Sequence, residues 1–404
     1  MPNRSFPPGV ACVQGHHQGE ALHEALSRVK TPWVVLQDAG VDYTGTPWPL
    51  LLAPLTADQA DAVYAAGNPA WDSRALGGIT RWLTRAPISN PHSGLRAFAV
   101  APLLKLHLRS ESLDGLDWEI IFKLAAQEYR LKEVPIPLEQ GRTTTWAGRL
   151  SQARTLMRYA TVLNDADNTH EGYNTLAQME RAPRYNAWLG RRFREHLGKR
   201  VLEVGAGIGT ITRELEPGLE LLIALEMDPF YIERLKNRFR DKPHVRPYLS
   251  GVERADWERL RAENIDTIVL SNVLEHIEDD EAAIQNFRRV LKPGGRLLTL
   301  IPALPALFGS MDEAVGHFRR YTPHRISHLL RAHGFEVEQL EWMNLVGVPG
   351  WFVNGRLFKR RVVPGLQLRA YDVLAPLFAE LESHVTLPVG LSLFTVARAV
   401  GNGT

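Results

Sequence analysis

The stretch Val201-Leu-Glu-Val-Gly-Ala-Gly-Ile-Gly-Thr210 decides the fold of the second half of this chain. Its first four residues predict a buried strand, which breaks at glycine where a helix is expected to begin. Gly205, Gly207 and Gly209 have no Cβ, so a ligand can approach the backbone closely there. Their G-x-G-x-G spacing differs from the G-x-G-x-x-G loop that binds a dinucleotide diphosphate. The loop therefore favours a ligand that carries a ribose and no diphosphate.

A second apolar run, Leu221-Leu-Ile-Ala-Leu-Glu226, predicts the next strand of the same sheet. It ends in a carboxylate at the place where nucleotide-binding α/β folds put the acid that binds ribose hydroxyls, about 20 residues after the glycines. The remaining apolar runs alternate with helical segments, which is typical of a doubly wound, mostly parallel sheet. Together they predict a seven-stranded sheet, with further strands at 245–249, 267–271, 296–301, 335–343 and 391–398.

With 404 residues the chain is long enough for two domains. The polar stretch 164–173 interrupts the apolar pattern and predicts a linker. We therefore expect an N-terminal domain at 1–160, a linker at 161–180 and a second domain at 181–404. The N-terminal domain is predicted to be a smaller α/β unit with a helix and three strands, at 116–129, 33–36, 62–64 and 131–136.

The composition excludes several classes of partner and compartment. The net charge is +2 and no Lys/Arg block is long, so a nucleic-acid partner is not expected. A single cysteine, Cys12, excludes a disulfide framework and a cysteine-based metal site, and it fits a reducing cytoplasm. The N-terminus lacks the pattern of a signal peptide, and no run has the length of a membrane span. We expect a cytoplasmic protein.

Two more motifs follow the glycine loop and Glu226 in order. Thr267-Ile-Val-Leu-Ser-Asn-Val-Leu-Glu-His-Ile277 ends the fourth strand, and Val290-Leu-Lys-Pro-Gly-Gly-Arg296 introduces the fifth. From about residue 181 to the C-terminus, the chain resembles the class I S-adenosylmethionine-dependent methyltransferases. The resemblance implies a Rossmann-like sheet, a methyl-transfer reaction and S-adenosylmethionine as the cofactor.

The resemblance also implies which residues hold the cofactor, because in open α/β sheets ligands bind at the carboxyl ends of the strands. One position departs from the family: many members carry an acid after the third strand that contacts the adenine amino group, and here Ser250, Gly251, Glu253 or a backbone group would have to replace it. The residues expected to bind S-adenosylmethionine are Glu203, Gly205, Ala206, Gly207, Gly209, Glu226, Met227, Ser271, Asn272 and His276.

In that family, a helix before the glycine loop often folds over the cofactor. Here that helix would begin at 180–189, and Arg184, Tyr185 and Trp188 are the candidates for a lid. Ordinary packing of an amphipathic helix explains Tyr185 and Trp188 equally well.

The segment 308–322, after the fifth strand, corresponds to the part of the family that lines the methyl acceptor. His317 is suited to accept a proton near neutral pH, Asp312 could orient it, and Tyr321 or Arg320 could hold an acceptor oxygen. We therefore predict His317, Tyr321 and Asp312 as catalytic residues. The alternatives are that this run caps the next helix and pins the loop over the cofactor, and that His276 is the base. Neither histidine has metal-ligating residues at useful spacing, so no metal is expected.

Residues 15 to about 160 resemble the later part of a family 2 glycosyltransferase with a GT-A-like fold. In active relatives an Asp-x-Asp motif holds a metal, but here the run is Asp38-Ala39-Gly40, with Asp42 nearby. The nucleotide-binding strands of that fold have no expected counterpart before Gly15. We expect a truncated, degenerate domain used for docking, dimerisation or substrate presentation; the alternative is a transferase that uses Asp38 and Asp42. The resemblance rests on the runs 15–19, 34–43, 93–98, 115–120 and 133–137.

Together these features predict a methyltransferase that acts on an oxygen or nitrogen of a small-molecule, glycan or glycolipid acceptor in a biosynthetic pathway. The alternatives are a bifunctional glycosyltransferase/methyltransferase and a non-catalytic scaffold of a pathway complex. The aromatic insertion 344–356, followed by Lys359-Arg360-Arg361, is expected to form an acceptor-pocket wall, the surface of a homodimer, or a peripheral membrane contact near a lipid-linked sugar.

Overall fold

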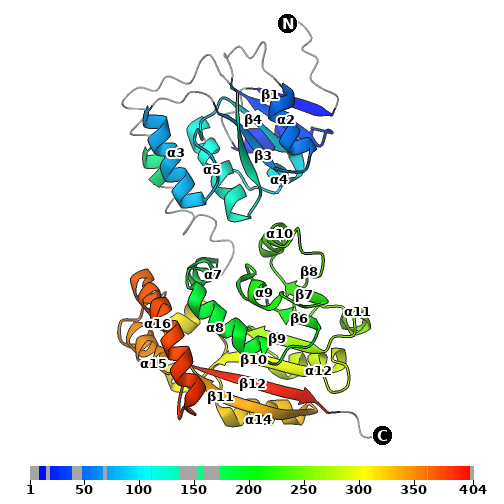
Figure 1. The fold of residues 1–404 in the computed structure, drawn as a ribbon, viewed down its shortest axis with the longest axis vertical. Coiled ribbons are helices and arrows are strands. Elements are labelled where there is room, and N and C mark those ends of the chain that lie inside the picture. Colours follow the sequence, from blue (N-terminus) through cyan, green and yellow to red (C-terminus); the bar gives the residue numbers. More distant parts are fainter. Residues whose placement is uncertain are drawn as a thin grey trace, which may run out of the picture. The chain divides into compact units, whose positions relative to one another are not determined.

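The computed structural model describes residues 9–14, 19–38, 48–66, 71–110, 112–136, 153–157, 173–361 and 363–400. The chain divides into two compact units, Met1–Asn168 and Thr169–Thr404, each with its own sheet (Figure 1). The division falls inside the segment 161–180, which was expected to be a linker. The end of that segment is not extended, because Tyr173–Glu180 form helix α7.

The second unit contains a seven-stranded mixed sheet in the order β11-β12-β10-β9-β6-β7-β8. The five strands β10, β9, β6, β7 and β8 are parallel to one another, and β12 is antiparallel to both of its neighbours, β10 and β11. The predicted strands are confirmed to within one residue at each end. They are β6 (Arg200–Val204), β7 (Leu221–Glu226), β8 (Val245–Leu249), β9 (Thr267–Ser271), β10 (Arg296–Pro302), β11 (Phe335–Met343) and β12 (Ser392–Ala399).

Helices cover both faces of this sheet (Figure 1). Successive strand residues point to opposite faces, so Val201 packs against one set of helices and Leu202 against the other. The first set includes α8 (Pro183–Arg194), α10 (Pro229–Arg238) and α16 (Gly365–His384), and the second includes α12 (Asp280–Val290) and α14 (Pro323–Ala332). Burial of each large apolar side chain in these layers contributes about 1.5–3 kcal/mol. The shorter helical segments are α9 (Thr210–Leu215), α11 (Trp257–Ala262), η1 (Leu274–His276), η2 (Pro305–Leu307) and α13 (Ser310–Ala314).

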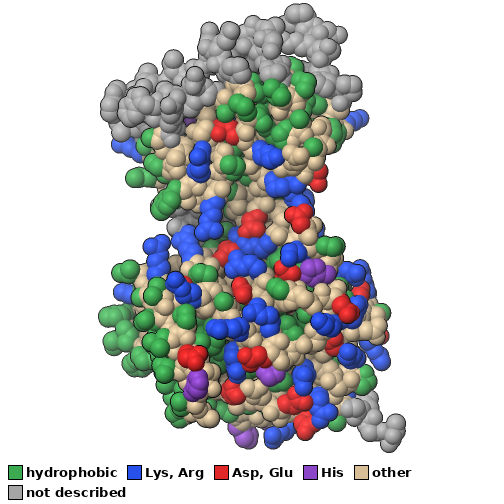
Figure 2. Space-filling model, viewed as in Figure 1, with side chains coloured by type: hydrophobic (Ala, Val, Ile, Leu, Met, Phe, Trp, Pro, Cys, Tyr) green, Lys and Arg blue, Asp and Glu red, His purple; other side chains and the backbone are tan. Residues whose placement is uncertain are grey.

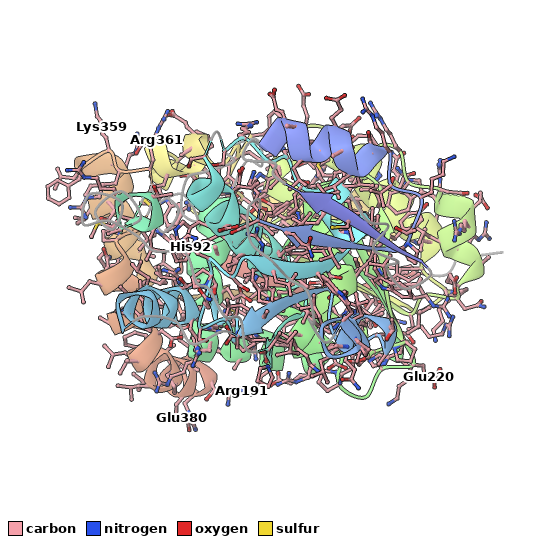
Figure 3. All side chains as sticks on the ribbon, turned by 90° about the horizontal axis from the view of Figure 1, so that it is seen from above. His92, Arg191, Glu220, Lys359, Arg361 and Glu380 are labelled. Atoms are coloured by element: carbon pink, nitrogen blue, oxygen red, sulfur yellow. The ribbon has the colours of Figure 1, made fainter. Side chains whose placement is uncertain are left out.

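The connection from β11 to β12 is a long insertion that contains α15 (Gly347–Trp351), the π-helix η3 (Phe352–Leu357) and α16. Lys359, Arg361 and Glu380 of this insertion lie at the margin of the molecule and point outward (Figure 3). Elsewhere on the face shown in Figure 2, basic and acidic side chains are interspersed. Within the described residues, no helix is both long enough and apolar enough to cross a membrane.

The first unit contains a five-stranded mixed sheet in the order β1-β2-β4-β3-β5. The predicted strands are confirmed as β2 (Trp33–Gln37), β3 (Ala62–Ala66) and β5 (Leu131–Pro135), and β4 (Leu95–Ala99) is antiparallel to both of its neighbours. A strand that was not predicted, β1 (Val10–Gln14), precedes Gly15 and pairs in parallel with β2, while the expected lack of nucleotide-binding strands stays a prediction. The helices are α1 (Gly19–Ser27), α2 (Trp48–Thr56), α3 (Trp71–Thr84), α4 (Val100–Leu104) and α5 (Leu113–Ala126).

Candidate active site

The glycine loop connects β6 to α9 with three residues in the left-handed region of backbone space. Gly205, Gly207 and Gly209 have φ values of 70°, 54° and 80°. A Cβ added at Gly205 would lie 2.6 Å from Cγ2 of Val273, so a side chain cannot be accommodated there. The backbone N–H groups of Gly205 and Ala206 both donate to the carbonyl oxygen of Leu225, which holds the loop against β7.

Glu226, the last residue of β7, is tied to this loop. Its carboxylate accepts hydrogen bonds from the backbone N–H of Gly207 at 2.8 Å, of Met227 at 2.8 Å and of Asp228 at 3.0 Å. Burial raises the pKa of Glu226, and the three N–H donors offset part of that rise. A carboxylate has about four acceptor sites, so room remains for a ribose hydroxyl.

Glu203, on β6, is a second buried carboxyl group beside Glu226. Only 2% of Glu203 is exposed, and its Oε2 has no hydrogen-bond partner among the described residues. Burial raises the pKa of Glu203 to about 8, and the charge of Glu226 adds to that rise. The buried carboxyl of Glu203 lacks a hydrogen-bond partner at Oε2, and the neighbouring glycine loop leaves space that side chains would fill. These two features fit a ligand that has cationic groups and a ribose. S-adenosylmethionine is such a ligand.

The segment after β8 lies alongside Glu226. The N–H of Ser250 donates to the carbonyl oxygen of Glu226 at 2.9 Å, and a Cβ on Gly251 would lie 3.9 Å from Cβ of Met227. Met227 is 71% exposed and Leu249 is 52% exposed. Two exposed apolar side chains at this edge form a surface on which a flat ring such as adenine could pack, although no acid occupies the family position.

The end of β9 reaches the same edge of the sheet. Asn272 adopts a φ of 54°, which is uncommon for a residue other than glycine and is often found at functional sites. Its N–H donates to the carbonyl oxygen of Leu300 at 2.8 Å, so the neighbouring strand holds this conformation. Ser271 is partly buried just before it, and the chain then enters η1, which carries His276.

The helix that lies over the glycine loop is α7. A Cβ on Gly207 would lie 3.3 Å from Cδ1 of Leu176, and Glu180 anchors the helix to α10 through an ion pair with Arg234 at 2.7 Å. The helix in contact with Gly207 is therefore α7, and the lid expected on α8 stays a prediction.

On α8, Tyr185 and Trp188 are buried against the sheet and the neighbouring helices, as expected if these side chains serve ordinary packing of an amphipathic helix. Arg184 lies 3.7 Å from Asp372 of α16, whose carboxylate also accepts from the backbone N–H groups of Arg184 and Tyr185.

On the acceptor side, Asp312 and His317 form a hydrogen-bonded pair. Asp312 is fully buried, and its Oδ1 lies 2.9 Å from Nδ1 of His317. Burial raises the pKa of Asp312, but the hydrogen bond from His317 and the charge of Arg320 outweigh it and hold this pKa below its ordinary value. Because the ionised carboxylate only accepts, Nδ1 carries the proton and Nε2 is the basic nitrogen.

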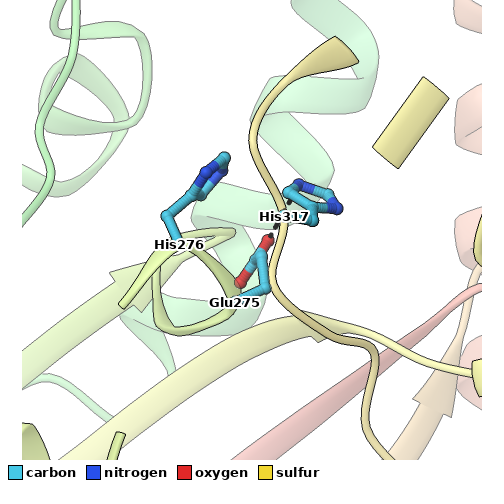
Figure 4. A group of neighbouring side chains, drawn as sticks. All are labelled: Glu275, His276 and His317. Atoms are coloured by element: carbon cyan, nitrogen blue, oxygen red, sulfur yellow. Dashed lines mark ion pairs between the residues drawn. The ribbon is translucent and has the colours of Figure 1, made fainter. Parts of the chain in front are cut away.

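Two further side chains converge on His317 (Figure 4). Oε1 of Glu275 lies 3.7 Å from Nε2 of His317, and the rings of His276 and His317 meet edge to face with centroids 4.6 Å apart. Glu275 is fully buried, neither of its carboxylate oxygens has a hydrogen-bond partner among the described residues, and burial raises its pKa to about 8. Burial, with His317 nearby, lowers the pKa of His276 to about 4.

The ligating atoms of Glu275, His276 and His317 all lie within 4.8 Å of one another. The expectation that neither histidine has metal-ligating company was therefore wrong, because the fold joins residues that are far apart in the sequence. The expectation that the site uses no metal stays a prediction.

Arg320 and Tyr321 do not have the placement that we predicted. Arg320 is 4% exposed and donates to Asp312 and to the carbonyl oxygen of Ala303, both at 2.8 Å. Tyr321 is fully buried, and its hydroxyl donates to Asp280 at 2.9 Å. Because the hydroxyl of Tyr321 is buried and bonded to Asp280, the prediction of Tyr321 as a catalytic residue is corrected. The hydrogen bonds of Arg320 and Tyr321 instead fit the alternative that this run holds the loop 308–322 in place.

Two residues of the site, Leu176 and Glu275, were not among the predicted site residues, and a third, Trp351, lies in the insertion 344–356, for which an acceptor-pocket wall was one of three predictions. Leu176 lies in the segment that was expected to be a linker, and Glu275 lies in the fourth-strand motif, from which only Ser271, Asn272 and His276 were predicted as site residues. Trp351 comes from the distant insertion: its Nε1 donates to Oδ2 of Asp312 at 3.3 Å, and Arg320 lies over its ring at 4.8 Å. The sequence signals for these residues were the apolar spacing of α7, the carboxylate of the fourth-strand motif and the aromatic composition of the insertion 344–356.

In the first unit, Asp38 is the only carboxylate in the run Asp38-Ala39-Gly40, where active glycosyltransferases carry Asp-x-Asp, and it already forms an ion pair. Asp38 is 7% exposed and accepts from Nη2 of Arg96 at 3.0 Å, and Arg96 also contacts Asp117. A guanidinium keeps its charge at all physiological pH values, so this partner disfavours a metal cation at Asp38. Asp42 lies outside the described residues.

Comparisons with known proteins concern the second unit. A family model described as a methyltransferase domain matches residues 177–340. Nodulation protein S of Rhizobium tropici is 32% identical over 116 residues, which cover 28% of this chain and 43% of that protein. Ubiquinone biosynthesis O-methyltransferase of Xanthomonas axonopodis pv. citri is 25% identical over 167 residues, which cover 41% of this chain and 69% of that protein.

The structure of an S-adenosylmethionine-dependent methyltransferase from Mesorhizobium loti aligns with a TM-score of 0.36 and 16% identity, covering 52% of this chain and 96% of that one. The chain spans less than half the length of the nodulation proteins that it matches. The matched family model covers the glycine loop, the ends of β7 and β9, and the segment that carries His317. Residues 177–340 of this chain therefore form a methyltransferase domain, for which S-adenosylmethionine is the cofactor.

Proposed function

We propose that the protein transfers a methyl group from S-adenosylmethionine to an oxygen or nitrogen of a small-molecule, glycan or glycolipid acceptor in a biosynthetic pathway. The cofactor supplies an electrophilic methyl group on a sulfonium. The chain itself must bind the cofactor, align the acceptor and remove a proton from it. The carboxylate of Glu226 is proposed to bind the ribose hydroxyls of the cofactor, and the backbone of the glycine loop is proposed to lie against the cofactor. Glu203 is proposed to contact its cationic part.

The hydrogen-bonded pair of Asp312 and His317 is the observation that supports proton removal from the acceptor. Asp312 fixes the proton on Nδ1 of His317, which leaves Nε2 to accept the proton of the acceptor hydroxyl or amine. Asp312 touches neither acceptor nor cofactor in this proposal, so it is a positioning residue. The buried surroundings exclude water from the pair, since the side chain of His317 is only 8% exposed.

The substitution His317→Asn tests the base. The asparagine amide can donate to Asp312 in place of Nδ1, but it cannot accept a proton. We expect cofactor affinity, measured by calorimetry, to stay unchanged and the rate of methyl transfer to fall by about 10²–10⁴-fold. His276→Asn tests the alternative base, whose ring contacts that of His317, and chelation by EDTA is expected to leave the rate unchanged. A normal rate in His317→Asn, or a collapse only in His276→Asn, would contradict the assignment.

A non-catalytic scaffold is the competing function, and cofactor binding separates the two. The unsatisfied Oε2 of Glu203 and the N–H donors on Glu226 favour a site that binds a ligand. Calorimetric titration with S-adenosylmethionine should show binding that Glu226→Ala weakens. No binding at millimolar cofactor would exclude the enzyme.

We also propose that the first unit is a glycosyltransferase-like domain without transferase activity, used for docking or dimerisation in the cytoplasm. The ion pair between Asp38 and Arg96 supports this, because it occupies the carboxylate that a metal-bound sugar nucleotide would need. A bifunctional enzyme is the alternative. Titration of the full chain with a nucleoside diphosphate sugar and Mn²⁺ should show no metal-dependent binding; saturable binding would favour the bifunctional enzyme.

A further inference from the structure

The insertion between β11 and β12 exposes an unusual number of apolar side chains. They lie on η3, α16 and the turns next to these helices and to α15, where Figure 2 shows hydrophobic side chains gathered beside basic ones. Large exposed apolar surfaces mark binding sites for proteins, ligands or membranes. We call this set the apolar face; it comprises Leu345, Val346, Phe352, Val353, Leu357, Phe358, Leu366, Val373, Leu374, Leu377, Leu381 and Val385, each at least 36% exposed.

Helix α16 is apolar on two sides. Leu368 and Ala375 face inward and pack in the same cluster as residues of α8. Leu366, Val373 and Leu377 recur at helical spacing on the other side and are 82%, 61% and 55% exposed. A surface helix ordinarily carries polar side chains on its outer side, so the outer side of α16 has the composition of a buried surface.

The charges around the apolar face are predominantly positive. Residues 344–385 contain five Lys and Arg side chains, at 356, 359, 360, 361 and 369, against three acids. Asp372 is buried and caps α8, and Glu382 accepts from the backbone N–H groups of Asn344 and Leu345. Glu380 lies away from Lys359 and Arg361, toward the other end of the insertion (Figure 3). A second copy of this face would bring cations against cations, whereas an anionic surface complements them.

The apolar face is continuous with the acceptor side of the site. Trp351, which donates to Asp312, directly precedes Phe352, a residue that is 50% exposed. The hydroxyl of Ser310 lies 2.9 Å from the carbonyl oxygen of Gly355 and 2.7 Å from that of Arg360 and shares its one proton between them, so the insertion is tied to the helix that carries Asp312. A group held at this face therefore lies next to the chain segment that positions His317.

We propose that the apolar face binds the surface of an anionic lipid bilayer, with its apolar side chains among the acyl chains and its basic side chains at the headgroups. Amphipathic surfaces of this kind lie on a membrane and do not span it. Together with the proposed function, this assigns the methyl acceptor to the class of lipid-linked molecules, whose polar end would reach His317 from the bilayer surface. That last step rests on the proposed function, and the membrane binding does not.

The test is sedimentation of the full chain with vesicles of phosphatidylglycerol and phosphatidylcholine, compared with vesicles of phosphatidylcholine alone. We expect binding to the anionic vesicles that weakens with added salt. The triple variant Leu357→Ser/Phe358→Ser/Leu366→Ser should bind roughly 100-fold more weakly. The variant Lys359→Gln/Arg361→Gln should bind roughly 25-fold more weakly to anionic vesicles only. The matched control, Leu50→Ser/Ile79→Ser/Trp82→Ser, removes three exposed apolar side chains of the first unit and should bind normally.

Calorimetry with S-adenosylmethionine, run on every variant, reports whether the second unit is folded and whether the proposed function holds. Absence of vesicle binding by the wild-type chain overturns the membrane proposal even if the cofactor binds. Equal binding by the control and the triple variant also overturns it. A dimer in analytical ultracentrifugation that only the triple variant converts to a monomer, without vesicle binding, would assign the apolar face to a second copy. Vesicle binding without cofactor binding would leave the membrane surface standing and remove the proposed reaction.

Discussion

At the scale of single residues, the site is built from buried carboxyl groups whose environments differ. Asp312 has His317 and Arg320 as partners and stays ionised, whereas Glu203 and Glu275 have buried oxygens without hydrogen-bond partners among the described residues. Burial raises the pKa of both glutamates to about 8, so without a ligand each is largely protonated at neutral pH, and the cationic part of the cofactor would favour the ionised form of Glu203. Pairs of acids whose environments separate their pKa values are a common feature of functional sites.

The raised pKa of Glu275 makes the stability of the protein depend on pH. The folded chain holds this proton up to a pKa of about 8, whereas the unfolded chain releases it near 4.5. Between these values the folded state binds more protons, so the free energy of unfolding falls as pH rises, by at most about 1.4 kcal/mol per pH unit from this group.

The substitution Glu275→Gln removes that dependence, because the amide does not titrate. Urea unfolding of Glu275→Gln and the wild type should give a difference in the free energy of unfolding that grows in favour of the variant between about pH 5 and pH 8. Glu380→Gln, at the exposed surface, is the control. A difference that stays constant with pH would show that Glu275 ionises normally in the folded chain.

At the scale of elements, periodicity predicted the strands well and the connections poorly. Strands β6 to β12 were predicted within one residue of each end because their apolar runs are bounded by turn residues and charges. Helix α7 was missed because its residues follow a polar stretch that reads as a linker. Its position over the glycine loop depends on Glu180 pairing with α10, and no pattern within α7 reports that contact.

The position of Leu176 predicts that α7 contributes to cofactor binding. Its side chain lies beside Gly207, so Leu176→Ala would remove apolar surface that covers the proposed ribose site. We expect S-adenosylmethionine to bind roughly tenfold more weakly by calorimetry, because about 1–2 kcal/mol of apolar contact is lost. Gln178→Ala on the same helix is the control and should bind as the wild type does. Unchanged affinity in Leu176→Ala would place the lid elsewhere.

At the scale of the whole molecule, two units with separate sheets and cores share one chain. Every residue proposed for methyl transfer lies between 173 and 361, in the second unit. The fragment 169–404 is therefore expected to fold alone and to bind S-adenosylmethionine with the affinity of the full chain, measured by calorimetry. A folded fragment with much weaker binding would show that the first unit contributes to the site.

The sequence by itself determined the α/β class, the seven strands of the second sheet and the glycine loop, because these depend on local periodicity and on residues close together in the chain. Only the tertiary structure placed Glu275 beside His317, paired Asp38 with Arg96, buried Tyr321 and joined Trp351 to Asp312. These contacts connect residues far apart in the sequence, and burial and charge act through space, so neither leaves a trace in the local pattern. The glycine loop could therefore be interpreted from ten residues, whereas the acceptor side required the whole fold.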